Sequence, residues 1–182
     1  MRIGIDISQI VHEGTGVATY VRNLVAATIK QDKNNEYVLF GASLRKKYVF
    51  EEYFRKISSP NVKLVTVLIP PTVLDILWNK WGVVPIEWIT GPLDIFWSSD
   101  WTQPPLGGAV GMTTIHDVSF LRFPEAFAKV IVDVHKRRLA RVKKICQIIL
   151  CDSEATKKDL INLLHFPKEK LSVVYPGFRL TI

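Results

Sequence analysis

Short apolar runs alternate with segments of helical periodicity along the chain. Between Val17 and Ile29 the apolar side chains recur at intervals of three and four, the spacing of one helical face. The preceding run, Arg2–Ile7, is of strand type. The same criteria predict strands at Glu36–Gly41, Val62–Ile69, Leu93–Ser98, Val110–His116, Gln147–Asp152 and Leu171–Tyr175, and helices at Leu44–Ile57, Thr72–Trp88 (interrupted near Gly82 and Pro85), Glu125–Ile145 and from the N-cap Ser153 to Leu164.

This alternation predicts an α/β fold: a doubly wound, Rossmann-like, mostly parallel sheet with helices on both faces. The strand Gln147–Cys151 carries apolar residues on both faces, as expected when helices cover both sides of a parallel sheet. Ligands of such sheets bind at the carboxyl ends of the strands. We therefore expect the site in the loops that follow the strands. These loops are Ser8–Gly16, Ser98–Gly108, His116–Pro124 and Asp152–Ser153.

Composition fits one ordinary globular domain with a single core. The chain has 182 residues, of which 48% are apolar and 23% charged. Met1 and Arg2 lead directly into a strand pattern, so no secretory signal is predicted. The longest apolar run, Leu64–Leu77, is broken by a Pro-Pro pair and an aspartate, and it is too short to cross a bilayer.

The two cysteines, Cys146 and Cys151, stand five residues apart in a predicted strand. An odd offset directs them to opposite faces of the sheet, so no disulfide between them is predicted. Free thiols fit a reducing cytosol. We expect a cytoplasmic protein, peripheral to the inner face of the membrane if it contacts lipid.

Basic residues account for a net charge of +7 and gather in two regions. These regions are Arg45–Lys47 with Arg55 and Lys56, and Lys136–Arg138 with Arg141, Lys143 and Lys144. They are interpreted either as solvated helix faces or as contacts for an anionic membrane surface or a phosphorylated ligand. Nucleic acid is not an expected partner, because no nucleic-acid-binding module accompanies the charge.

Aromatic and basic residues interleave in the predicted helix Leu44–Ile57. One interpretation is a helix that buries its aromatic side chains and exposes its lysines. The other is a helix that lies on a membrane surface.

A glycine turn, Gly14-Thr15-Gly16, stands between the first predicted strand and the first predicted helix. Its backbone N–H groups can approach an anion closely, and the helix N-terminus adds partial positive charge. Plain strand-to-helix connections also use such turns. The loop lacks a full Gly-x-Gly-x-x-Gly pattern and is too long for the dinucleotide-binding fingerprint, which argues against a dehydrogenase.

Histidine and carboxylate residues follow the later strands. His116-Asp117 ends the fifth predicted strand, and Asp152-Ser153 ends the sixth. A histidine at a strand end beside a glycine turn can form hydrogen bonds with a sugar hydroxyl, or can simply be a buried structural histidine. Aromatic residues of these loops could stack on sugar rings or lipid; they are Trp97, Trp101, Phe120 and Phe123.

Other chemistries lack their required residues. His116-Asp117 resembles a metal-binding pair, but no partner histidines stand at suitable spacing, so no metal site is predicted. No Gly-x-Ser-x-Gly sequence is present, which argues against a serine hydrolase. His12 lies in the first loop, where it faces either an acceptor or solvent, while His135 and His165 fall on predicted helices and are assigned structural roles.

Taken together, these segments resemble the N-terminal half of a retaining glycosyltransferase of family 4, which has the GT-B architecture. The resemblance is closest to the mannosyltransferase-like and rhamnosyltransferase-like branches, and it spans nearly the whole chain in the family's order. The matching segments are Ile-Gly-Ile-Asp at 3–6, Gly-Thr-Gly-Val-Ala-Thr-Tyr-Val-Arg-Asn-Leu at 14–24, Thr-Ile-His-Asp-Val at 114–118 with Phe123-Pro124-Glu125, Ser-Glu-Ala-Thr-Lys-Lys-Asp-Leu at 153–160, and Leu-Ser-Val-Val-Tyr-Pro-Gly at 171–177.

The resemblance implies a role for each matching residue. Gly14, Thr15 and Gly16 would face the diphosphate of a nucleotide-sugar donor, and His116 would be the catalytic residue beside the transferred sugar. Asp117 and Ser153 would shape the loops around it. The remaining residues of the expected acceptor side are His12 and Trp101. No metal or other cofactor is implied, because the nucleotide sugar is a substrate.

The resemblance also implies a division into domains. Residues 1–177 would be the acceptor-side domain, and residues 178–182 the start of an interdomain linker or a cut end. The donor-binding domain, with its Glu-x7-Glu motif, would be a second and separate partner domain. The acceptor would be a glycan or a lipid-linked hydroxyl.

Two expectations follow for the 182 residues by themselves. The chain should be inactive or nearly so, because half of the stabilisation of the leaving diphosphate would be absent, and its interdomain face should favour a dimer. The alternative function is a non-catalytic module that binds a glycan, a membrane or a partner chain.

Overall fold

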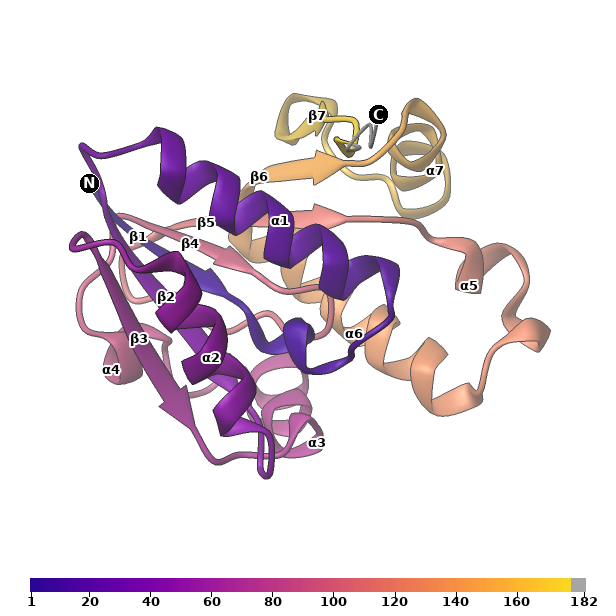
Figure 1. Cartoon of the computed structure of the whole chain (residues 1–182). Coiled ribbons are helices and arrows are strands. Elements are labelled where there is room, and N and C mark those ends of the chain that lie inside the picture. The colour runs from indigo at the N-terminus through magenta and orange to yellow at the C-terminus, as the bar shows by residue number, and fades with distance from the viewer. Residues whose placement is uncertain (178–182) are drawn as a thin grey trace.

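The computed structural model describes residues 1–177, in which seven parallel strands form one sheet in the order β3-β2-β1-β4-β5-β6-β7 (Figure 1). The predicted linker at 178–182 lies outside the described residues. The strand order reverses between β1 and β4, which is the topological switch point of a doubly wound sheet. The strands are β1 (Arg2–Asp6), β2 (Glu36–Ala42), β3 (Val62–Val67), β4 (Ile95–Ser98), β5 (Val110–Ile115), β6 (Cys146–Cys151) and β7 (Leu171–Val173).

Helices cover both faces of this sheet, which confirms the predicted fold class. Helices α1 and α2 cross one face, and α6 lies behind the sheet (Figure 1). The α-helices are α1 (Gly16–Gln31), α2 (Lys47–Ile57), α3 (Pro71–Leu74), α4 (Glu87–Thr90), α5 (Ser119–Arg122), α6 (Lys129–Ile145) and α7 (Glu154–Leu164). A π-helix, η2 (Asp75–Trp81), continues α3, and the 3-10 turns are η1 (Ser8–Val11), η3 (Pro124–Ala126) and η4 (Lys168–Lys170).

The core divides at the sheet. On one side, Val25 and Ile29 of α1 and Phe50 of α2 pack over Ile5 and Leu39 of the strands. On the other side, Leu74, Trp78 and Ile86 pack against Phe40 and Phe96. A third cluster joins α6 and α7 to β5, β6 and β7. The sheet is therefore held by apolar packing on both faces, which leaves the strand ends for polar chemistry.

Several predicted helix boundaries differ from the structure. The helix predicted at Thr72–Trp88 is α3, the π-helix η2 and, after a break, α4. The helix predicted from Leu44 begins at Lys47, and the helix predicted from Glu125 begins at Lys129. The loop predicted to run to Pro124 instead contains α5. The residue before a proline is disfavoured in helical geometry, and Phe123 has φ −132° and ψ 60°, so the chain breaks there and turns once as η3 before α6 begins.

The aromatic side chains of α2 point into the core. Phe50 and Tyr53 are buried, and the outward lysines Lys47 and Lys56 each pair with a glutamate one helical turn away. This arrangement favours the first of the two interpretations, a helix that buries its aromatic face. Its exposed surface carries both charge signs.

The two cysteines are free thiols, as predicted, and both are buried. Burial raises the pKa of Cys146 to about 12 and that of Cys151 to about 11, so neither is a reactive thiolate at neutral pH. Among residues 1–177, no helix combines the length and the apolar character that crossing a bilayer requires.

Candidate functional site

Four strands end side by side at one edge of the sheet, and their loops form the candidate site. The strands β1, β4, β5 and β6 are consecutive neighbours in the sheet. Their carboxyl ends bring together the glycine turn, the loop 99–102, His116 and Asp152. These positions are those predicted from the strand–loop pattern.

The glycine turn caps the first helix. Thr15 is the N-cap of α1, where its hydroxyl oxygen accepts a hydrogen bond from the N–H of Ala18 at 3.2 Å and donates one to the carbonyl of His12 at 2.9 Å. Gly14 has φ +81°, a left-handed conformation that favours glycine. Thr15 therefore fixes the direction in which the N-terminus of α1 points.

The surface over this turn is open. A Cβ atom added at Gly14 or at Gly16 would meet no atom within 4 Å. Gly16 also lacks a positive φ, so neither conformation nor packing within the described chain requires a glycine there. A backbone left bare at a helix N-terminus is suited to the close approach of an anion.

His116 and Asp152 form a close polar pair that joins the ends of β5 and β6. Nδ1 of His116 lies 2.6 Å from Oδ2 of Asp152, and their side chains are 15% and 19% exposed. The ring of Tyr20, from α1, meets the imidazole edge-on with its centroid 4.9 Å away. Where the carboxylate oxygen accepts from an Nδ1–H, Nε2 is left to bind a ligand.

The residues beside this pair in sequence shape the backbone. Ser153 caps α7 by accepting a hydrogen bond from the N–H of Thr156 at 3.1 Å, and the Thr156 hydroxyl donates to the carbonyl of His116 at 3.0 Å. Asp117 is exposed, and its carboxylate accepts from the N–H of Ser119 at 2.7 Å. The carboxylate that holds the imidazole is thus Asp152 rather than the adjacent Asp117.

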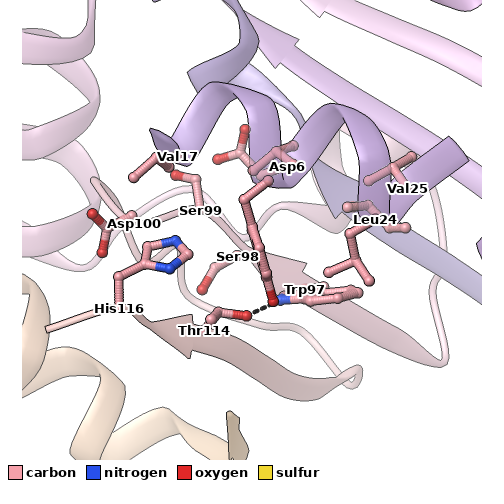
Figure 2. A pocket seen from close by; sticks show the side chains of 13 residues that line it. Asp6, Val17, Leu24, Val25, Trp97, Ser98, Ser99, Asp100, Thr114 and His116 are labelled. Carbon is pink, nitrogen blue, oxygen red and sulfur yellow. Dashed lines mark hydrogen bonds between the residues drawn. The ribbon is translucent and has the colours of Figure 1, made fainter. Parts of the chain in front are cut away.

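A small cavity lies beneath α1, next to His116 (Figure 2). Its volume of about 30 Å³ is close to that of one water molecule. Asp6 lines it: Oδ1 accepts from the N–H of Ser8 at 2.8 Å, while Oδ2 is buried with no protein partner in the described residues. Burial raises the pKa of Asp6. Figure 2 also shows Trp97 donating from Nε1 to the hydroxyl of Thr114 at 3.2 Å.

A larger cleft of about 560 Å³ opens beside the glycine turn, within the size range of small-molecule sites. It contains His12 and Trp101, both predicted as acceptor-side residues, together with Thr15. Its other lining combines apolar, uncharged polar and charged side chains. The apolar ones are Val11, Val17, Ala42, Leu44, Pro71 and Leu74, the uncharged polar ones include Ser8, Gln9, Ser43, Ser99 and Thr102, and the charged ones are Arg45, Lys46 and Asp100.

His135 also lines this cleft, although sequence reasoning assigned it a structural role. Its ring stacks on Phe120 at 5.0 Å between centroids and meets Trp101 edge-on at 5.3 Å. Burial lowers the pKa of His135, which favours the neutral ring at physiological pH. The three rings form an aromatic wall beside Asp100.

Arg138 supports the site from below. The second basic segment was interpreted as a solvated helix face or an anion contact, but Arg138 is only 1% exposed. Its guanidinium donates to the hydroxyl of Thr113 at 2.6 Å, to the carbonyl of Thr114 at 3.2 Å and to Asp100 at 3.3 Å. It therefore ties the end of β5 to the loop that carries Trp101.

No group of three or more histidine, cysteine, aspartate or glutamate side chains is placed to hold a metal ion within residues 1–177. The groups gathered at this edge are a helix N-terminus, an oriented imidazole and the aromatic wall of Trp101, His135 and Phe120. Such groups bind hydroxyls, anions and flat apolar surfaces.

Comparison with protein families identifies a family that this chain matches. The family model described as Glycosyltransferase Family 4 matches residues 14–181, which is nearly the whole chain. The matched range includes Thr15, Trp101, His116, His135 and Asp152. The site residues before it are Asp6, Val11, His12 and their neighbours in η1. Comparison with the curated proteins finds no relative.

Proposed function

The chain belongs to glycosyltransferase family 4, and we propose that residues 1–177 form the acceptor-side domain of a retaining glycosyltransferase. The donor is a nucleotide diphosphate sugar, with a mannose-like hexose as the leading candidate, and the acceptor is a glycan or a lipid-linked hydroxyl. The observation that carries the proposal is the open N-terminus of α1 on the same sheet edge as the His116–Asp152 pair.

The proposed reaction moves one glycosyl group. The bond between the anomeric carbon and the β-phosphate oxygen breaks, and the electron pair leaves with the nucleoside diphosphate. A bond from the acceptor hydroxyl oxygen to the same carbon forms on the face that the phosphate leaves. The hydroxyl proton passes to the departing phosphate, so the products are the glycoside and the protonated nucleoside diphosphate.

The glycine turn is proposed to receive the donor's diphosphate. Negative charge on that group increases as the glycosidic bond breaks, and N–H groups fixed at a helix N-terminus stabilise such charge without reorganising. Thr15 holds the first turn of α1 in place. Because Gly14 and Gly16 leave open space above the backbone, phosphate oxygens can come within hydrogen-bond distance.

His116 is proposed to lie beside the transferred sugar. With the Nδ1–H donated to Asp152, Nε2 is free to accept a hydrogen bond from a sugar hydroxyl. Tyr20 restricts the ring from its edge. This holds the sugar in one orientation, and correct orientation of the reacting groups is a large part of transferase catalysis.

The larger cleft is proposed to hold the acceptor. Trp101 and His135 offer aromatic surface suited to a sugar ring, and His12 lines the same cleft next to the glycine turn. Arg45 and Lys46 add positive charge to the cleft. This composition favours an acceptor with both an apolar part and an anionic group.

A second domain is proposed to share the donor. The described domain offers the diphosphate the N-terminus of α1, and in the family the donor binds between two Rossmann-like domains. Residues 1–182 alone should therefore bind nucleotide sugars weakly and transfer little sugar.

Ligand-observed NMR on the purified chain tests the proposal with a panel of UDP-, GDP-, ADP- and dTDP-sugars. At least one donor should receive saturation from the protein, and Gly16→Val should abolish that transfer by filling the space over the turn. A variant at the far end of α7, His165→Asn, is the matched control and should behave as the parent chain. If no donor receives saturation, the donor-facing role is wrong.

A further inference from the structure

The segment between β3 and β4 presents an unusually apolar outer surface. Single exposed apolar residues are ordinary, but six large ones follow one another here, and two are tryptophans. Trp81 is 62% exposed and Trp88 is 79% exposed. The others are Leu68, Val73, Ile76 and Val83; together we call these six residues the tryptophan face.

The inner side of this segment packs into the core. Leu74 and Trp78 are buried against the strands, with Trp78 fully covered. A surface helix normally turns polar residues outward once its apolar stripe is buried. Here Val73, Ile76 and Trp81 occupy outward positions instead, so folding of the domain does not account for them.

The backbone holds the tryptophan face in a fixed position. The π-helix ends at Gly82, which has φ +67°, and Val84 follows with φ +63°, an uncommon conformation for a β-branched residue. The indole N–H of Trp78 donates to the carbonyl of Val84 at 3.1 Å. Trp81 and Val83 are thus displayed on a turn that is anchored from inside.

The exposed charge along this segment is positive. Lys80 is exposed, and the partly buried Arg141 packs its guanidinium against Gly82. The two carboxylates of the segment are engaged within the protein. Asp75 is buried and paired with Arg137, and Glu87 accepts hydrogen bonds from the backbone N–H groups of residues 107–109.

We propose that the tryptophan face rests in the headgroup region of an anionic lipid bilayer. Exposed tryptophans beside aliphatic side chains and cations are the composition of membrane-interface surfaces, where indole rings sit at headgroup level. The exposed Lys80 complements an anionic leaflet, and the net charge of +7 would repel a second copy of this chain. The inference goes beyond the proposed function because lipid binding requires no sugar transfer.

The placement has a consequence for the acceptor. Pro71 and Leu74 line the larger cleft, while Val73 and Ile76 of the same helical segment belong to the tryptophan face. One segment thus forms a wall of the cleft and the surface that meets the bilayer. A lipid-linked acceptor held in the bilayer would reach the cleft along that wall.

Vesicle co-sedimentation and tryptophan emission test this inference on the 182-residue chain. One vesicle contains phosphatidylcholine alone, and the other contains three parts phosphatidylcholine to one part phosphatidylglycerol. We expect binding to the anionic vesicle with a blue shift of the emission, and weaker binding to the neutral vesicle. Lys80→Gln should weaken anionic-vesicle binding about fivefold, because a basic residue near such a surface contributes about 1 kcal/mol.

The decisive variant is the double substitution Trp81→Ala with Trp88→Ala. Both side chains are mostly exposed, so thermal unfolding should match the parent chain, while vesicle binding should fall roughly tenfold or more. Tyr48→Ala is the matched control: Tyr48 is 60% exposed on α2, and its loss should leave vesicle binding unchanged.

Three outcomes would overturn the inference. The first is no binding to the anionic vesicle, and the second is undiminished binding by the double variant. The third is a parent chain that is dimeric by light scattering, becomes monomeric in the double variant and ignores vesicles, which would assign the face to a second copy. Saturation transfer from nucleotide sugars reports on the glycine turn separately, so failure here leaves the proposed function standing.

Discussion

The Nδ1 atom of His116 lies 2.6 Å from the Oδ2 atom of Asp152, although 36 residues separate them in sequence. The two residues follow β5 and β6, which pair in parallel with Ile115 opposite Cys151. Strand register therefore places both side chains at the same height on the sheet edge. The pair exists because two neighbouring strands end level with each other.

Removing the carboxylate should change the histidine's tautomer. In Asp152→Ala the Nδ1–H loses its acceptor, so the neutral ring should no longer favour the Nδ1-protonated form. A part-buried donor left without a partner should also lower the free energy of unfolding by about 1–3 kcal/mol. Nitrogen-15 NMR of the imidazole checks the tautomer, and urea unfolding checks the stability. An unchanged tautomer would show that Asp152 does not orient the ring.

The two glycines of the turn should respond differently to alanine. Gly14→Ala forces a side chain into φ +81° and should lower stability by about 1 kcal/mol. Gly16→Ala meets open space in helical backbone and should change stability by less than about 0.5 kcal/mol. Urea unfolding of both variants checks this contrast, and equal losses would contradict the described conformation of the turn.

Arg138 should be far more important to stability than its neighbour in the basic run. Arg138→Met leaves Thr113 and Asp100 without their buried donor, so we expect a loss of about 3 kcal/mol or more. Lys136→Gln, two residues away on the exposed side of α6, is the control and should change stability by less than about 0.5 kcal/mol. Denaturant unfolding measures the loss of stability in both variants. Similar losses would mean that the buried hydrogen bonds of Arg138 do not hold the end of β5 to the loop 99–102.

His135 should make stability depend on pH in the mildly acidic range. Burial lowers the pKa of His135 in the folded state, so the unfolded chain binds a proton first as pH falls below the ordinary histidine value of 6.5. The contribution of His135 to stability is therefore present above that pH and is lost as pH falls through the folded pKa. Subtracting the unfolding free energies of His135→Gln from those of the parent chain isolates it. A difference that is flat from neutral to acidic pH would contradict the burial of this ring.

Several features of the site followed from sequence alone. Strand and helix periodicity predicted the doubly wound sheet, and that fold places ligands at the carboxyl ends of strands. Gly14, His116 and Ser153 could thus be placed at one edge before any contact was known. Ser153 also followed from local chemistry, because an N-cap serine accepts from the helix N–H groups just beyond it.

Other features depend on contacts that no local pattern encodes. Asp117 follows His116 directly, yet adjacent residues at a strand end point to different sides, and the partner of His116 comes from the next strand. Arg138 lies in a run of basic residues that reads as a solvated surface, and only the packing of α6 on the sheet buries it. His135 is in the cleft for the same reason: its side of α6 faces Trp101.

The most direct test of the central claim is an NMR titration of the nitrogen-15-labelled chain with the donor that the saturation experiment identifies. The account predicts that the amide signals of Gly14, Thr15 and Gly16 and the ring signals of His116 shift together, saturating at one shared affinity. Shifts confined to residues away from this edge, or none at high donor concentration, would contradict the assignment of the glycine turn and His116 to a nucleotide-sugar site.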